Sequence, residues 1–249
     1  MKTLTILLLA LLVSALSFAQ KEKGINLDEI KVTPPQFTGF NNTVSMVNQN
    51  GELPLNNYLK QNLQYPEEAL KTRCQGTEVI RFEVTVDGNL TNFQVVNSIS
   101  PQIDKELITL LEGTNGMWAA GQNNGTPATM EKEVSVVYKW AACEGLAKCA
   151  DFVKLAKVCL KKGNKQLLVK KHPEKALKFY SHGLKYRPNE DCLLMARGIC
   201  KYELGDKEGA NEDWKRMSLE GINSGAIRSA QLFDDTSAYA ELAALLTAK

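Results

Sequence analysis

Between residues 79 and 96, apolar and polar residues alternate on both sides of the pair Asp87-Gly88. Such alternation predicts two strands that each bury one face, and an Asp-Gly pair between them is a strong signal for a hairpin turn. With Asp87 and Gly88 as the two turn residues, the expected cross-strand pairs on the buried face are Phe82–Phe93 and Ile80–Val95. The residues between them along the first strand, Arg81 and Glu83, are expected on the opposite face.

Helix signals stand on both sides of this predicted hairpin. Residues 55–63 form a short helical pattern that an extended segment follows. Ser100 can cap a second helix, with Pro101 at its first position and Gly113 as its stop. The apolar stripe of that helix is expected to be Ile103, Leu107, Leu110 and Leu111. After a turn at residues 118–121, the alternation in residues 133–140 predicts a last strand.

The last hundred residues carry helical patterns that recur with a period of 34 residues. Ala176 and Ala210 are separated by this period, and so are Tyr180 and Trp214. Small residues at such positions let paired helices approach, and aromatic residues fill the space between them. The segment resembles a short tetratricopeptide array of about two units. That resemblance implies a scaffold that binds peptides or protein subunits.

Two further segments flank these repeats. Residues 152–160 are amphipathic and predict a preceding helix. Asn164 stands where the repeat usually has glycine, which makes the first unit degenerate. Between residues 220 and 246 another apolar period is suited to capping helices, and its members are Ala238, Leu242, Leu245 and Leu246.

A series of short motifs follows in order through residues 34–140. They are Pro35-x-Phe37-x-Gly39, Tyr58-Leu59-x-x-Asn62, Tyr65-Pro66-x-x-Ala69, Gly76, Phe82-x-Val84-x-x-Asp87-Gly88, Ile103-Asp104-Lys105-Glu106, Trp118-x-x-Gly121 and Gly125-Thr126-Pro127. Taken in this order, the motifs resemble the TonB C-terminal domain, in the variety common in Bacteroidetes energy transducers. The resemblance implies a small antiparallel sheet with two helices, and it does not extend to the last hundred residues.

In the resembled family, the last strand lies at the edge of the sheet and captures a short peptide of an outer-membrane receptor. An edge strand can do this because its unpaired N–H and C=O groups accept an extended peptide. The resemblance implies that the peptide-binding residues here are Val134, Ser135, Val136, Val137 and Tyr138. A secondary candidate site is formed by Gln64, Tyr65 and Pro66. The alternative is an edge closed by the following domain or by self-pairing, in a structural adaptor.

The N-terminus carries the pattern of an export signal. Lys2 precedes an apolar run over residues 4–16, and Ser17-Phe18-Ala19 offers a small-x-small cleavage site. The run is shorter than the ~20 residues that span a membrane. We therefore expect a periplasmic mature protein that begins near Gln20, with an uncleaved inner-membrane anchor as the alternative.

The sequence departs from the resembled energy transducers in its spacer. Those proteins keep a membrane helix and a long proline-rich segment that crosses the periplasm. Here about fifteen residues separate the predicted cleavage site from the domain, a reach of roughly 50 Å when extended. Energy transduction is therefore expected only if the N-terminal helix remains in the membrane. Ala120 also replaces the proline that is usual in the Trp-x-Pro-Gly turn.

Six cysteines in an exported chain favour disulfide bonds. Cys143 and Cys149 are close enough in sequence to bridge the junction between the two domains. Cys159 and Cys192 could face each other on neighbouring helices. The alternative is that the cysteines are buried thiols that pack as small hydrophobic side chains, above all Cys74 and Cys200.

Charge and motif content narrow the possible function classes. The net charge of +2 gives no argument for nucleic-acid binding. Residues 20–144 have ten basic and fifteen acidic side chains, whereas residues 145–249 have nineteen and thirteen, an asymmetry that fits two domains. A lysine-rich run over residues 154–171 is either a contact for an acidic peptide or lipid surface or a solvated helix face. His172 and His182 lack the spacing of a helical metal pair, and we expect no enzyme activity, metal or cofactor.

Together, the patterns predict an α+β protein with a TonB-like antiparallel sheet followed by an all-α tetratricopeptide-like domain. The expected organisation is a signal peptide over residues 1–19, a linker over 20–33, the TonB-like domain over 34–141 and the helical domain over 142–249. We expect an exported protein-interaction module that captures an extended receptor peptide by strand addition. A second protein or peptide is expected on the helical repeats. The alternatives are the anchored energy transducer and the structural adaptor.

Overall fold

The computed structural model describes residues 31–39, 54–139, 151–219, 233–234 and 236–247. Its α+β organisation confirms the predicted fold class, with an antiparallel sheet and helices in the first part and, among the described residues after 151, helices without strands. The predicted signal peptide and the cysteines Cys143 and Cys149 lie outside the described residues. No helix in the described ranges is long and apolar enough to cross a membrane.

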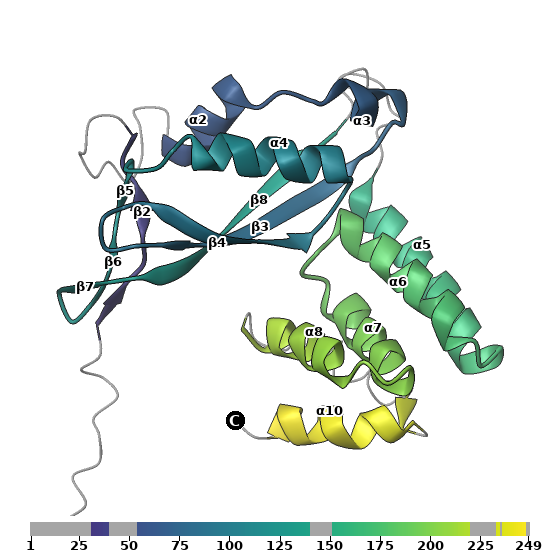
Figure 1. The fold of residues 1–249 in the computed structure, drawn as a ribbon. Coiled ribbons are helices and arrows are strands. Elements are labelled where there is room, and N and C mark those ends of the chain that lie inside the picture. The colour runs from purple at the N-terminus through teal and green to yellow at the C-terminus, as the bar shows by residue number, and fades with distance from the viewer. Residues whose placement is uncertain (1–30, 40–53, 140–150, 220–232, 235, 248–249) are drawn as a thin grey trace, which may run out of the picture.

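The main sheet has three antiparallel strands in the order β4-β3-β8. They are β3 (Gly76–Val84), β4 (Leu90–Asn97) and β8 (Met130–Tyr138). Helices α2 (Pro54–Asn62) and α4 (Pro101–Glu112) cover one face of this sheet (Figure 1). Helices α7 (Asp191–Glu203) and α8 (Lys207–Leu219) lie beyond the opposite face. As predicted, Ser100 caps α4 by accepting a hydrogen bond from the Ile103 N–H.

The hairpin between β3 and β4 turns through three residues, not two, so the two-residue Asp87-Gly88 turn was wrong. The Gly88 N–H donates to the Thr85 carbonyl, and the Thr85 N–H donates to the Asn89 carbonyl. Gly88 has φ +77°, which only glycine adopts at little cost. A tight turn followed by a left-handed glycine is another common hairpin loop, and Asp-Gly suits both loops.

The register between β3 and β4 is nevertheless close to the expected one. Ile80 and Val95 are partners, and the rings of Phe82 and Phe93 lie 5.5 Å apart. A register shift between Arg81 and Glu83 restores this pairing after the longer loop. Ile80 and Phe82 are fully buried, but Val95 is 42 % exposed. Val95 was expected on the buried face, and its exposure is understandable because β4 is an outer strand.

Five short strands extend the sheet region at one end, and none of them was predicted. They are β1 (Val32–Thr33), β2 (Gln36–Phe37), β5 (Trp118–Ala119), β6 (Gly121–Asn123) and β7 (Thr126–Ala128). Strand β1 pairs with β6, β2 with β5, and β6 with β7. Phe37 packs against Trp118, with ring centroids 5.4 Å apart. Strand β1 therefore lies inside the segment predicted as a linker.

The C-terminal part is a stack of helices. Its elements are α5 (Phe152–Asn164), the π-helical turn η5 (Lys165–Val169), α6 (Pro173–Tyr186), α7 (Asp191–Glu203), α8 (Lys207–Leu219) and α10 (Ser237–Thr247). Helix α5 packs against α6, α6 against α7, and α7 against α8 (Figure 1). Ala238 and Leu242 of α10 are fully buried in the same core.

The 34-residue period marks equivalent positions in two helix pairs. Tyr180 lies against Gly163, and Trp214 lies against Gly198. A methyl group on Gly163 would approach the Tyr180 ring to 2.3 Å, and one on Gly198 would approach Trp214 Nε1 to 2.2 Å. Gly163, and not Asn164, therefore occupies the small position of the first pair. Asn164 instead accepts a hydrogen bond from the Tyr180 hydroxyl.

We predict that Gly198→Ala destabilises the protein, although alanine is the better helix former by about 1 kcal/mol. The added methyl group forces the Trp214 indole away from the Met195 carbonyl, to which its N–H donates. Overpacking of this kind typically costs about 1–3 kcal/mol. Urea denaturation measures the effect, and in the double variant with Trp214→Phe the loss should be smaller than the sum of the two single losses. A more stable Gly198→Ala variant would contradict the packing described here.

Candidate functional site

Strand β8 forms one edge of the main sheet. Its nine residues pair with β3 in an unbroken register from Gly76↔Tyr138 to Val84↔Met130. Within the described part of the chain, no strand pairs with the other side of β8. Because the N–H and C=O groups of successive residues point to opposite sides of an antiparallel strand, every second residue of β8 presents these groups on the outer side. The five residues predicted as a peptide-binding edge all lie in this strand.

The side chains of β8 alternate between the two faces of the sheet. Val134 and Tyr138 are buried beneath the helix-covered face, at 5 % and 4 % exposure. Val136 is partly buried on the same face. Ser135 and Val137 are exposed, and Val137 is 56 % exposed. Apart from main chain, the strand therefore offers a partner only small side chains at its C-terminal half.

An open pocket of about 370 Å³ lies beside the N-terminal half of β8. Its walls come from Pro34–Phe37, from the start of α2 and from Trp118, and β8 contributes residues 132–135. The aromatic contact between Phe37 and Trp118 shapes its apolar side. The pocket was not predicted, because it depends on the two-residue strand β2, whose partner is some eighty residues away.

The secondary candidate site lies at the other end of β8. The Tyr65 ring packs edge-on against Tyr138, with centroids 5.4 Å apart, and its hydroxyl donates to the Cys74 carbonyl. Pro66 directly precedes the short helix α3 (Glu67–Lys71), and Gln64 is exposed. The Tyr65 side chain is therefore committed to packing, although it lies next to the primary strand.

A buried carboxyl group stands beneath the same end of β8. Glu78 is fully buried in β3, opposite Val136, and accepts a hydrogen bond from the Ile99 N–H. Burial, with the nearby Asp104 carboxylate as a smaller cause, raises its pKa to about 8. Glu78 Oε1 and the Tyr138 hydroxyl have no hydrogen-bond partner among the described residues.

The sheet and the helices meet where α6 ends against β3 and β4, a contact we call the seam. Asn97 Nδ2 donates to the Leu184 carbonyl at 3.1 Å, and Thr77 Oγ1 donates to the Tyr186 carbonyl at 3.1 Å. The last carbonyls of a helix have no partner within it, so these side chains satisfy groups that would otherwise need water. A methyl group on Gly76 would lie 2.5 Å from the Lys185 carbonyl oxygen, so only glycine fits there.

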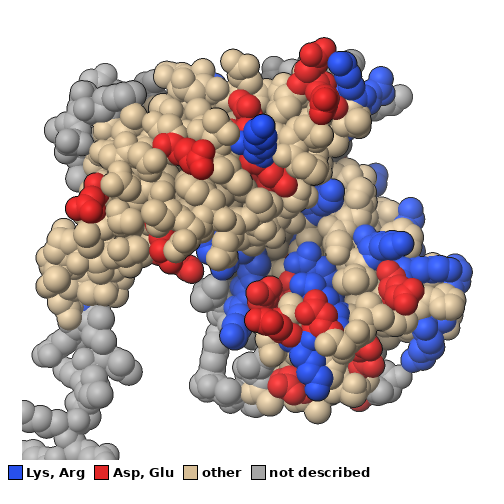
Figure 2. Space-filling model, in the orientation of Figure 1, with Lys and Arg blue, Asp and Glu red and all other residues tan. Residues whose placement is uncertain are grey.

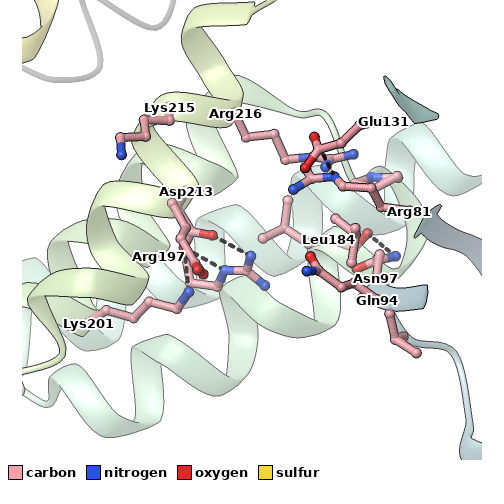
Figure 3. Close-up of a pocket in the computed structure, with 14 residues that line it drawn as sticks. Arg81, Gln94, Asn97, Glu131, Leu184, Arg197, Lys201, Asp213, Lys215 and Arg216 are labelled. Atoms are coloured by element: carbon pink, nitrogen blue, oxygen red, sulfur yellow. Dashed lines mark hydrogen bonds and ion pairs between the residues drawn. The ribbon is translucent and has the colours of Figure 1, made fainter. Parts of the chain in front are cut away.

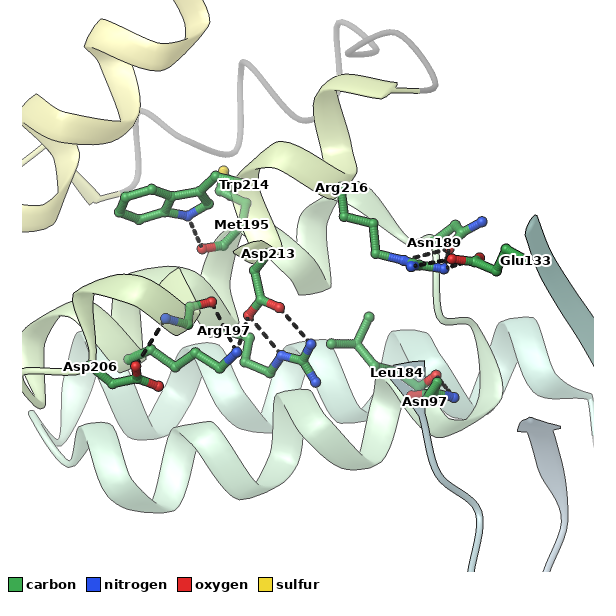
Figure 4. A network of polar contacts seen from close by, with 12 residues as sticks. Asn97, Glu133, Leu184, Asn189, Met195, Arg197, Asp206, Asp213, Trp214 and Arg216 are labelled. Carbon is green, nitrogen blue, oxygen red and sulfur yellow. Dashed lines mark hydrogen bonds and ion pairs between the residues drawn. The ribbon is translucent and has the colours of Figure 1, made fainter. Parts of the chain in front are cut away.

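A second attachment joins α8 directly to β8. Arg216 donates to both oxygens of Glu133, at 2.9 and 2.6 Å, and also to Asn189 Oδ1 (Figure 4). Only 13 % of the Arg216 side chain is exposed. At the far end of the strand, the Lys139 ammonium lies over the Phe152 ring. The helices therefore reach β8 through side chains, and strand pairing plays no part in these contacts.

Other candidates from the sequence do not join this site. Cys159 is buried, Cys192 is half-buried, and no disulfide joins them. On α5 and η5, Lys154, Lys157, Lys161 and Lys165 are exposed, opposite the buried Phe152, Ala156 and Cys159. This is the geometry of a solvated face, which was one of the two readings of the lysine-rich run.

Residues 61–140 match the model of the family described as Gram-negative bacterial TonB protein C-terminal. The match includes α4 and all three strands of the main sheet, and therefore all of β8. It does not include the helical repeats. No curated protein and no solved structure matches the chain.

The buried Glu78 makes stability depend on pH in a defined direction. Its pKa in the folded protein, about 8, exceeds the ordinary 4.5, so the folded state keeps a proton that the unfolded state loses between these values. The free energy of unfolding should therefore fall as pH rises from about 5 to 8, by on the order of 1 kcal/mol per pH unit. Glu78→Gln, which cannot ionise, should flatten that slope in denaturant titrations at several pH values. Equal slopes in the two proteins would show that Glu78 does not hold the proton.

Proposed function

We propose that the protein is an exported interaction module of the cell envelope that captures an extended peptide on the outer side of β8. The observation that carries the proposal is the edge itself: over nine residues, no strand among the described residues pairs with that side. The family match over residues 61–140 supports a protein partner of the TonB type, namely the N-terminal peptide of an outer-membrane receptor. No reactive side chain is needed, because main-chain hydrogen bonds supply the affinity.

The surroundings of β8 favour an extended ligand. The exposed side chains of Ser135 and Val137 are small and leave room beside the strand. The pocket beside residues 132–135 can receive an apolar side chain of the peptide against Phe37 and Trp118. Main-chain pairing and one apolar anchor together are a common way to combine affinity with specificity.

In this proposal, the helical repeats are a second binding domain. Ala176 and Ala210, 34 residues apart, are both fully buried, as expected of equivalent positions in a tetratricopeptide-like array. Such arrays bind proteins or peptides and catalyse no reaction themselves.

Two neighbouring proline substitutions in β8 test the strand-addition proposal. Adjacent residues of an antiparallel strand direct their N–H groups to opposite sides. One of the two variants, Ser135→Pro or Val136→Pro, therefore removes a hydrogen bond to β3 and should lower Tm. The other variant removes only an N–H group that points away from the sheet. The variant that keeps the wild-type Tm should bind receptor N-terminal peptides at least tenfold more weakly in fluorescence anisotropy. Peptide binding that this variant leaves unchanged would favour the structural adaptor.

The N-terminus separates the exported module from an anchored energy transducer. We expect mass spectrometry of the protein from the native envelope to give a mature chain that begins near Gln20. A chain that retains the apolar run over residues 4–16 and fractionates with the inner membrane would instead support the transducer. Either result leaves the proline test on β8 interpretable.

A further inference from the structure

We propose that the cleft between the main sheet and helices α7 and α8 is a second binding site, specific for an extended acidic peptide. The cleft has a volume of about 650 Å³ (Figure 3). One wall is the end of β4, the roof is the polar face of the sheet around Arg81, and the opposite wall is formed by α7 and α8. It is separate from β8's outer edge, and the proposal does not depend on the proposed function of that edge.

The cleft is held open by the contacts between the two regions. On one side, the seam fixes the end of α6 against Thr77 and Asn97. On the other side, Arg216 binds the Glu133 carboxylate and fixes α8 beneath β8. A cavity with walls that are already tied in place binds its ligand without the entropic cost of ordering them. Sites of this kind are common where two domains meet.

The wall formed by β4 is the edge of that strand. Four consecutive residues, Gln94 to Asn97, line the cleft. Side chains of consecutive strand residues point to opposite faces, so a wall that includes all four must be the edge and not one face. Strand β4 is the outermost strand of the main sheet on this side among the described residues. Its main chain can therefore pair with an extended peptide in the cleft.

The charges in the cleft select the ligand. The lining has five basic side chains and three carboxylates, namely Arg81, Arg197, Lys201, Lys215 and Arg216 against Glu131, Glu212 and Asp213. Glu133, which pairs with Arg81 and Arg216, is a fourth carboxylate and leaves an excess of one positive charge. Asp213 is nearly buried and already binds two of these cations, Arg197 at 2.6 Å and Lys201 at 3.2 Å. Figure 2 shows basic side chains gathered where the sheet meets the helices. A ligand with carboxylates complements this excess.

Arg81 is the cation best placed to bind a ligand carboxylate. Its ion pairs are loose, at 3.5 Å to Glu133 and 4.0 Å to Glu131, and 31 % of its side chain is exposed. Arg216, in contrast, is engaged by Glu133 and Asn189 through short hydrogen bonds. A guanidinium with loosely held donors can form the bidentate pair that arginine makes with carboxylates. Val95, 42 % exposed, and Leu184 offer the apolar part of the surface.

The test uses a labelled peptide of alternating valine and aspartate and a second peptide with asparagine in place of aspartate. Fluorescence anisotropy at low salt should show binding of the acidic peptide and at least tenfold weaker binding of the neutral one. Gln94→Glu, which places a carboxylate opposite Arg81 on the cleft face of the sheet, and Arg81→Gln should each weaken binding of the acidic peptide at least tenfold. The matched control is Gln122→Glu, the same change at an exposed glutamine of β6 outside the cleft, and it should alter the affinity less than twofold.

Hydrogen exchange by mass spectrometry then locates the peptide, because strand addition protects the amides with which it pairs. The acidic peptide should slow exchange in residues 94–97 and leave residues 134–138 unchanged. Equal losses of affinity in Gln94→Glu and Gln122→Glu, or protection confined to β8, would overturn the cleft proposal and leave the proposal for β8 unaffected. Unchanged binding by a folded Arg81→Gln variant, with the wild-type Tm, would also overturn it.

Discussion

The contact between the C-terminal end of α6 and the sheet determines how the rest of the molecule is arranged. The carbonyls of Leu184 and Tyr186, at the end of α6, have no hydrogen-bond partner within the helix. Asn97 and Thr77 of the sheet donate hydrogen bonds to them. Each such hydrogen bond contributes only about 1 kcal/mol, but an unsatisfied buried carbonyl costs more than that. The geometry is also strict, because Gly76 leaves no room for a methyl group against the Lys185 carbonyl. If these carbonyls had their hydrogen-bond partners elsewhere, the helical stack would not lie beneath this sheet.

With the helices fixed there, the main sheet has two outer strands in different surroundings. Strand β4 borders a charged cleft, whereas β8 lies beside an apolar pocket. Exposed edges invite uncontrolled pairing, and proteins commonly protect them with charges that point inward or along the edge. Lys132 is such a charge, since it is paired with the buried Phe82 on the helix-covered side of β8. Its position discourages indiscriminate sheet extension at the N-terminal half and leaves the C-terminal half, with Ser135 and Val137, more accessible.

Local patterns in the sequence predicted the longer helices and strands, but neither the two- and three-residue strands nor the contacts between elements. Some features depend on residues that are near one another in the sequence and could therefore be recognised. They are the Ser100 cap, the β3–β4 pairing and the 34-residue period. Strand β2 has two residues and a distant partner, and no periodicity can reveal so short a segment. The seam joins Asn97 to Leu184 through polar groups that look like ordinary surface residues in a sequence. Gly163 was missed because η5 adds one residue to the expected spacing.

The ion pair between Arg216 and Glu133 couples the position of the sheet to that of the helical stack. Glu133 is the neighbour of Val134 in β8, and Arg216 lies one turn or less from Asp213 and Trp214 in α8. Trp214 fills the space against Gly198, so a displacement of α8 relative to α7 would disturb a contact with no spare volume. Close-packed contacts of this kind resist small movements and transmit larger ones. The position of β8's first half is thus set by the same packing that holds the repeats together, and its second half is set by Tyr138 and the cluster around Ile103.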